Sequence, residues 1–280
     1  MSEFANFSSP PGRVLGGFRE WKPAGALGAS CEAVWLYEAG DAPVDHRLLP
    51  DGKPSLVIRI RRDSGYDATD SQLIVSGGLS HATWYRPRAH ECQIGLRLFP
   101  EAALLAGFFN PRDYADGCAR APLALTRQLD RIVNEAPSMP LAVTADRMIK
   151  SLAHRLVEQR DSLERFTAGS IRRSAGRVPI CRLAEQAGTS ERQLRRRFIN
   201  TMGLSPKRYS RVLRYLRAVL MAEDLLHPDW AGIAADCGYS DQSHLIRDAK
   251  ALTSISPAAL WSERRAESEM SNTPLASAAI

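Results

Sequence analysis

The stretch "LAEQAGTS" at residues 183–190 returns in altered form as "IAADCGYS" at residues 233–240. In each copy, an apolar residue and an alanine precede a glycine that can adopt a left-handed turn, and a serine that can cap the next helix follows. A short helix, a glycine turn and a second helix are the parts of a helix-turn-helix. One copy occurs in many helical hairpins, whereas two copies with a long helix between them are far more specific.

The segment after the first copy, "SERQLRRRFINTMG" (190–203), is predicted to be a recognition helix. Ser190 and Gln193 have the spacing of a capping box. Leu194 and Phe198 are one turn apart and are expected to bury against the preceding helix. At about 100° per residue, Arg192 and Arg196 then point away from that core, where their guanidinium groups can bind guanine or phosphate.

Between the two copies, "LSPKRYSRVLRYLRAVLMAEDLL" (204–226) carries apolar residues at helical spacing and predicts one long helix. Roughly 20 residues at ~1.5 Å each span about 30 Å, which is close to the ~34 Å repeat of B-DNA. Such a rod could place two recognition helices in successive major grooves on one face of the duplex.

With these motifs, the chain resembles the AraC/XylS family of bacterial transcription regulators over about residues 165–261. The resemblance implies two helix-turn-helix subdomains joined by a long helix, and a protein that activates or represses promoters. It carries the family's base-contacting positions onto Arg192, Arg195 and Arg196 in the first motif, and onto Gln242, Ser243, Ile246 and Arg247 in the second. We predict further DNA contacts from neighbouring polar side chains, namely Gln193, Lys207, Arg208, His244 and Lys250.

The second motif departs from the family pattern at Leu245, Ala249 and Ser254, where the family has two aromatic residues and a glycine. Ala249 is expected to remove part of a core ring, a change that costs ~3 kcal/mol in a well-packed site. Residues 171–217 have a net charge of +11, whereas residues 218–265 have −3. Asp241 and Asp248 flank Arg247, and acids near phosphates weaken binding. We therefore expect the second motif to contribute less binding energy.

Charge is unevenly distributed along the chain, which has a net charge of +6. Residues 171–265 hold 17 basic and 9 acidic side chains, a net charge of +8, and the remainder has −2. A basic third beside a nearly neutral remainder indicates a polyanionic partner.

The five cysteines are odd in number and form no C-x-x-C pair, which fits reduced thiols in the cytoplasm. No signal peptide is visible, and no apolar run approaches the ~18 residues of a membrane span.

The first 130 or so residues are predicted to form mostly strands. Short apolar runs alternate with turn-forming segments; they are "AVWLYEA" (33–39), "SLVIRI" (55–60), "QLIVSGG" (72–78) and "CQIGLRLFP" (92–100). This pattern favours an antiparallel barrel or sandwich, and the region resembles the cupin-like sensor domain that precedes some of these regulators. The expected fold class is therefore α+β.

Four segments are expected along the chain. They are a β-rich ligand-sensing domain (1–135), a linker with a connecting helix (136–161), a tandem helix-turn-helix domain (162–265) and a disordered tail (266–280).

Two functions other than a DNA-binding regulator stay open. A cupin-like barrel can hold a catalytic metal, but His46, His81 and His90 lack the H-x-H spacing and carboxylate cluster of such a site. The chain could also be a protein-interaction module with a degenerate DNA-binding domain. We predict a non-enzymatic protein without metal or cofactor, whose partners are promoter DNA and an unknown small-molecule effector. RNA polymerase and a second copy of the chain are further candidate partners, and no membrane association is expected.

Overall fold

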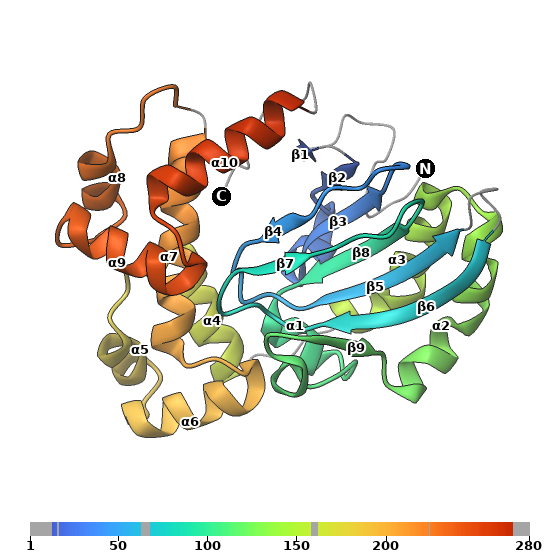
Figure 1. The fold of residues 1–280 in the computed structure, drawn as a ribbon. Coiled ribbons are helices and arrows are strands. Elements are labelled where there is room, and N and C mark those ends of the chain that lie inside the picture. Colours follow the sequence, from blue (N-terminus) through green and yellow to red (C-terminus); the bar gives the residue numbers. More distant parts are fainter. Residues whose placement is uncertain (1–12, 16, 63–67, 158–161, 224, 271–280) are drawn as a thin grey trace.

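The computed structural model describes residues 13–15, 17–62, 68–157, 162–223 and 225–270 (Figure 1). The sheet lies in the N-terminal half of the chain, and a helical C-terminal region packs beside it (Figure 1). The predicted α+β class is confirmed. No helix in the described part of the chain is long and apolar enough to span a membrane.

The described strands form one open antiparallel sheet of seven strands and a separate two-stranded ribbon. In spatial order, the sheet holds β1 (Arg13–Leu15), β2 (Phe18–Trp21), β3 (Cys31–Glu38), β8 (Cys92–Leu98), β5 (Ser55–Arg62), β6 (Ala68–Ser76) and β9 (Cys118–Arg120). The ribbon pairs β4 (His46–Leu48) with β7 (Thr83–Tyr85). The four predicted runs correspond to β3, β5, β6 and β8, which lie side by side in the sheet in the order β3-β8-β5-β6.

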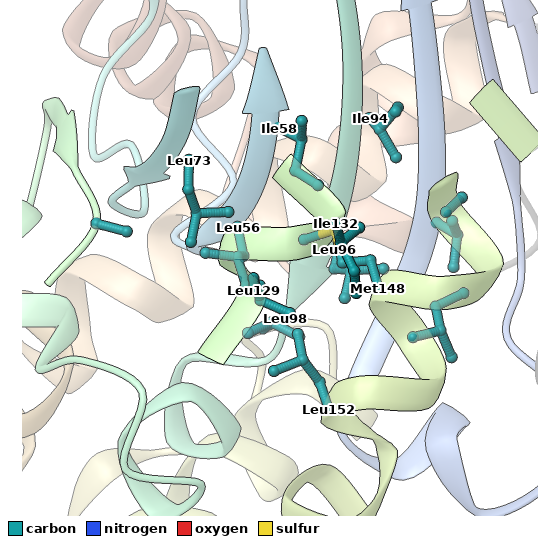
Figure 2. Close-up of a cluster of buried hydrophobic side chains, with 14 of the residues drawn as sticks. Leu56, Ile58, Leu73, Ile94, Leu96, Leu98, Leu129, Ile132, Met148 and Leu152 are labelled. Atoms are coloured by element: carbon teal, nitrogen blue, oxygen red, sulfur yellow. The ribbon is translucent and has the colours of Figure 1, made fainter. Parts of the chain in front are cut away.

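Alternate residues of a strand point to the same side of the sheet. On one side these residues are apolar, so that face is apolar. It packs against α2 (Leu123–Glu135) and α3 (Leu141–Val157). Figure 2 shows Leu56, Leu96 and Leu98 from the strands meeting Leu129 of α2 and Leu152 of α3. These side chains are at most a few per cent exposed, so the face and the two helices form the core of the N-terminal domain.

The helix α3 differs in role from the connecting helix expected within residues 136–161. Met148, Ile149, Leu152 and Leu156 are fully buried in the same core as the sheet. An amphipathic stripe predicts that a helix buries one face, but it does not identify the surface that covers it. The N-terminal domain therefore continues to Val157, and a boundary at residue 135 would cut through its core.

The C-terminal region has two hydrophobic cores that share α7 (Pro206–Glu223). The first core lies among α4 (Leu163–Arg173), α5 (Ile180–Gln186), α6 (Glu191–Met202) and the start of α7. The second lies among the rest of α7, α8 (Trp230–Asp236), α9 (Gln242–Thr253) and α10 (Pro257–Met270). Helix α10 thus continues into the tail expected to be disordered from residue 266, and residues 271–280 lie outside the described part.

Short elements complete the fold. They are the 3-10 turns η1 (Gly25–Ala29), η2 (Pro111–Tyr114) and η3 (Ala136–Ser138), together with the short helix α1 (Pro100–Leu105). The two predicted helix-turn-helix units are α5–α6 and α8–α9. Gly188 and Gly238 stand in their turns with φ of +59° and +79°, the left-handed conformation that the repeat predicts.

Candidate nucleic-acid interface

Helix α6 is fixed at its start by a cap and along one side by the first core. The Ser190 hydroxyl accepts a hydrogen bond from the backbone N–H of Gln193 at 3.2 Å, as the sequence predicts. The Gln193 side chain accepts from the Thr189 hydroxyl at 3.0 Å, which differs from the return bond to the cap residue in a full capping box. Leu194 and Phe198 are buried, and the Phe198 ring contacts Tyr209 of α7.

The opposite side of α6 is a row of exposed polar side chains. Arg192, Gln193, Arg195 and Arg196 are all exposed, and none of these arginines forms an ion pair with another described residue. Arg197 behaves differently, because its guanidinium donates to both carboxylate oxygens of Glu164 at 2.9 and 3.2 Å. Three of the four arginines on α6 are therefore available to a ligand.

Helix α9 is capped one residue later than the repeat predicts. The alignment places Ser240 at the cap, whereas Asp241 accepts the backbone N–H of His244 at 2.7 Å and α9 begins at Gln242. That hydrogen bond is the main reason that the pKa of Asp241 is lowered. The carboxylate of Asp241 is thus held by its own helix terminus, where a negative charge is favourable.

The predicted contact residues of α9 divide into two groups. Gln242, Ser243, Arg247 and Lys250 are exposed. His244 and Ile246 are half-buried, and the His244 ring lies edge-on to Tyr239. The exposed group continues along one side of the helix, as on α6.

Asp248 does not face the ligand side of α9, contrary to the expectation that it would lie unneutralised beside Arg247. Its side chain is 6% exposed and accepts two hydrogen bonds from Arg211 of α7, at 3.1 and 2.7 Å. Asp248 follows the buried Leu245 by three residues, so helical periodicity places it on the core side. One of the acids invoked to weaken the second motif is therefore already paired inside the protein.

Ala249 lies in a core that also contains large aromatic rings. It is fully buried in the second core, which contains the rings of Tyr215 and Tyr239. The Tyr215 hydroxyl lies 3.5 Å from that of Thr253 at the end of α9. The second core therefore holds two tyrosine rings in addition to the small side chain of Ala249.

The two predicted contact residues at the start of α7 lie in different surroundings. Lys207 is exposed, whereas Arg208 is half-buried and donates to the backbone carbonyl of Ser80 at 2.8 Å. Burial lowers the pKa of Arg208. Arg208 therefore contacts the N-terminal domain in this structure.

The three N-terminal histidines do not converge. His46 lies 2.9 Å from the Tyr37 hydroxyl, His81 lies 3.4 Å from Asp116, and His90 lies 3.5 Å from Asp41. Within the described ranges, no three His, Cys, Asp or Glu side chains gather where they could hold a metal ion.

The sheet face opposite α2 and α3 carries polar and aromatic side chains that are not among the predicted site residues. The indole of Trp35 lies over Gly95, where a Cβ would come within 2.0 Å of the ring. The Nε1 of Trp35 and the Nε of Arg59 are buried without a hydrogen-bond partner among the described residues. The alternation in "AVWLYEA" is the signal for this face, because Trp35 and Tyr37 alternate with the core residues Val34 and Leu36.

We compared the chain with known protein families, curated proteins and solved structures. Residues 183–262 match the family model described as a helix-turn-helix domain. No curated protein matches the chain. Among solved structures, ToxT from Vibrio cholerae O395 is similar at 9% identity over 81% of this chain and 95% of that one, with a TM-score of 0.41. The same protein bound to (E)-4-(8-methylnaphthalen-1-yl)but-3-enoic acid is similar at 8% identity over 82% and 97%, with a TM-score of 0.43.

Proposed function

We propose that residues 183–262, which match a helix-turn-helix family model, form an AraC-type domain, and that the chain is a transcription regulator whose α6 and α9 bind successive major grooves of promoter DNA. Recognition helices contact base edges with their N-terminal residues. Arg192 and Arg196 on α6, and Gln242 and Ser243 on α9, are exposed in that part of each helix.

The observation that carries this proposal is the pair of capped helices, each with a buried apolar side and an exposed polar side. The 18 residues of α7 separate the two units by about 27 Å at ~1.5 Å per residue, which is within reach of one turn of B-DNA. Three arginines of α6 are free to bind phosphate or the guanine edge. We expect α6 to supply more of the affinity than α9.

Selection of sites from randomised duplexes, followed by titration at one moderate salt concentration, tests this function. A regulator binds its selected site far more tightly than random DNA of equal length, typically by ~10³-fold or more. Equal affinity for the two would contradict sequence-specific binding and would favour the interaction-module alternative.

For the N-terminal domain, the proposed role is binding of a small effector on the sheet face that holds Trp35 and Arg59. The unpartnered groups there are both donors, so the ligand should present acceptor oxygens, as carboxylates and polyols do. A thermal-shift screen of small carboxylates and polyols checks this. The shift should disappear in Arg59→Gln and persist in Arg86→Gln, an exposed control whose partner is Asp45. A hit that shifts Arg59→Gln equally, or a screen without hits, would contradict this site.

The remaining partners are proposals of the same kind. A regulator acts in the cytoplasm, where promoter DNA is present, and the five free cysteines are compatible with that compartment. Contact with RNA polymerase and pairing with a second copy would follow from activation at a promoter, and co-purification on promoter DNA would detect both.

A further inference from the structure

The N-terminal domain binds the last turn of α9. The backbone N–H of Ala82 donates to the carbonyl of Leu252 at 2.6 Å, and Nη1 of Arg47 donates to the carbonyl of Thr253 at 3.2 Å. Both residues end the helix, where carbonyls have no intrahelical partner. Two groups from the β4–β7 region thus satisfy the C-terminal end of the second recognition helix.

Arg47 is held firmly in this position. Its Nε and Nη2 donate to the two carboxylate oxygens of Glu263 on α10, at 2.7 and 3.1 Å. Its guanidinium lies 4.4 Å from the ring centroid of Trp84, and its side chain is 13% exposed. Leu49, just after β4, packs against the second core. Figure 1 shows the ribbon reaching from the sheet toward the helical region.

The end of α6 is bound in a parallel way by η2. The side-chain amide of Asn110 donates to the backbone carbonyl of Asn200 at 3.3 Å, and Nη1 of Arg112 donates to the Asn200 side-chain oxygen at 3.1 Å. The backbone at Arg112 lies close to Gly203, which follows α6 as its C-terminal cap. The N-terminal domain therefore contacts the C-terminal end of each recognition helix.

The two contact regions belong to one connected unit. Asp116, just after η2, accepts the backbone N–H of Ser80 at 2.6 Å and the Ser80 hydroxyl at 2.8 Å. The Ser80 carbonyl in turn accepts from Arg208 at the start of α7. A movement of either loop would therefore disturb the other, so the ends of α6 and α9 are held by one body.

These contacts leave exposed the side of each helix that we propose contacts DNA. Arg192, Arg196, Gln242 and Arg247 are exposed while the domains are docked, so docking does not cover them. The two helices lie in separate cores that share only α7. A second connection, through the N-terminal domain, would fix their relative position more firmly than one helix can.

We propose that Arg47 and Arg112 are positioning residues that set the distance and orientation between α6 and α9, and so select the spacing of the two DNA half-sites. The inference rests on the proposed function. It makes the N-terminal domain part of the geometry of DNA recognition, with side chains that contact no DNA.

The test is the dependence of affinity on half-site spacing, measured with the full chain. The selected site is compared with versions carrying an insertion of one base pair or about half a helical turn, ~5 base pairs. The wild type should bind the unaltered spacing much more tightly than either insertion. In the double variant Arg47→Ala/Arg112→Ala, the second motif has a lower effective concentration at its half-site once the first motif is bound. The affinity for the unaltered site should therefore fall by about tenfold. Affinity for the insertions should stay nearly constant.

The ratio of the affinities for the unaltered and the inserted spacings distinguishes positioning from a loss of stability. Partial unfolding would lower the affinity for every site by the same factor and leave this ratio unchanged. Arg155→Ala is the matched control: Arg155 also binds a backbone carbonyl, of Gly107, and lies over an aromatic ring, Phe108, but inside the N-terminal domain. Its ratio should equal that of the wild type. An unchanged ratio in the double variant would overturn the inference while leaving DNA binding intact. Absence of specific binding by the wild type would instead overturn the proposed function.

Discussion

At the residue scale, the surroundings of Arg196 and Arg247 define what each can contribute to DNA binding. Arg196 is exposed on a helix whose neighbouring Arg192 and Arg195 are also free. Arg247 lies between Asp241, which caps its helix, and Asp248, which is paired with Arg211. The local acids should therefore weaken DNA binding by α9 less than the sequence suggests. The remaining reason to expect weaker binding by α9 is the difference in net charge between residues 171–217 and 218–265.

We propose that Arg196 makes a bidentate contact with guanine, so Arg196→Ala should cost ~1–3 kcal/mol of binding free energy and relax preference at one base position. Arg247→Ala should cost less. Titration of both variants at one salt concentration, on the selected site and its single-base variants, measures this, with Arg155→Ala as control. If Arg247→Ala loses as much binding free energy as Arg196→Ala, the two helices contribute equally to DNA binding.

Cysteine reactivity is a second property decided residue by residue. Burial raises the pKa of the Cys31 thiol to about 12, and it raises the pKa of Cys237 as well. Because the thiolate is the reactive form, Cys31 should stay unmodified by a disulfide reagent at pH 8. The exposed Cys118 and Cys181 should react at once. Mass spectrometry of the modified peptides, before and after unfolding, checks this; rapid labelling of Cys31 in the folded protein would contradict its burial.

At the element scale, the recognition helices end in the same conformation with different residues. Gly203 closes α6 with φ of +74°, and Ser254 closes α9 with φ of +68°. A side chain in the left-handed region costs ~1–2 kcal/mol relative to glycine. Ser254 thus carries a backbone strain that Gly203 in the first motif lacks.

Ser254→Gly should therefore raise the free energy of unfolding by about 1 kcal/mol, since glycine adopts this conformation without strain. The reverse change in the first motif, Gly203→Ser, is the matched comparison. It should destabilise more, because a Cβ there would lie 2.8 Å from that of Ala115. Denaturant unfolding of the two variants and the wild type measures both effects. A Ser254→Gly variant less stable than the wild type would show that the serine hydroxyl contributes more than the strain costs.

The elements also show how far local sequence patterns can predict this structure. Alternation and turn residues identify β3, β5, β6 and β8, and the repeat identifies both helix-turn-helix units with their glycine turns. The amphipathic pattern of α3 predicts a helix but not its place in the N-terminal core, because a connecting helix and a core helix share that pattern. The repeat predicts a cap at Ser240 in place of Asp241, because an adjacent serine satisfies the same local rule.

At the scale of the whole molecule, the unpredicted features are contacts between residues far apart in the chain. Asp248 is neutralised by Arg211 across the packing of α9 on α7. Arg47 and Glu263, at opposite ends of the chain, meet through the docking of the two domains. Each side chain looks like an ordinary surface charge in its own segment, so no local pattern distinguishes it. The exposed row on α6 was predictable because its geometry is set within two turns of one helix.

The hydrogen bond from the Ala82 N–H to the Leu252 carbonyl joins two backbones, so a side-chain substitution removes neither its donor nor its acceptor. The exchange rate of its amide proton therefore reports how often the two domains separate. In deuterated solvent it should exchange only when the domains part, and Arg47→Ala should accelerate that exchange while leaving core amides such as that of Ile58 in β5 unchanged. Hydrogen-exchange mass spectrometry of the two peptides gives the ratio. Equal rates for Ala82 in wild type and variant would mean that the domains stay together without Arg47.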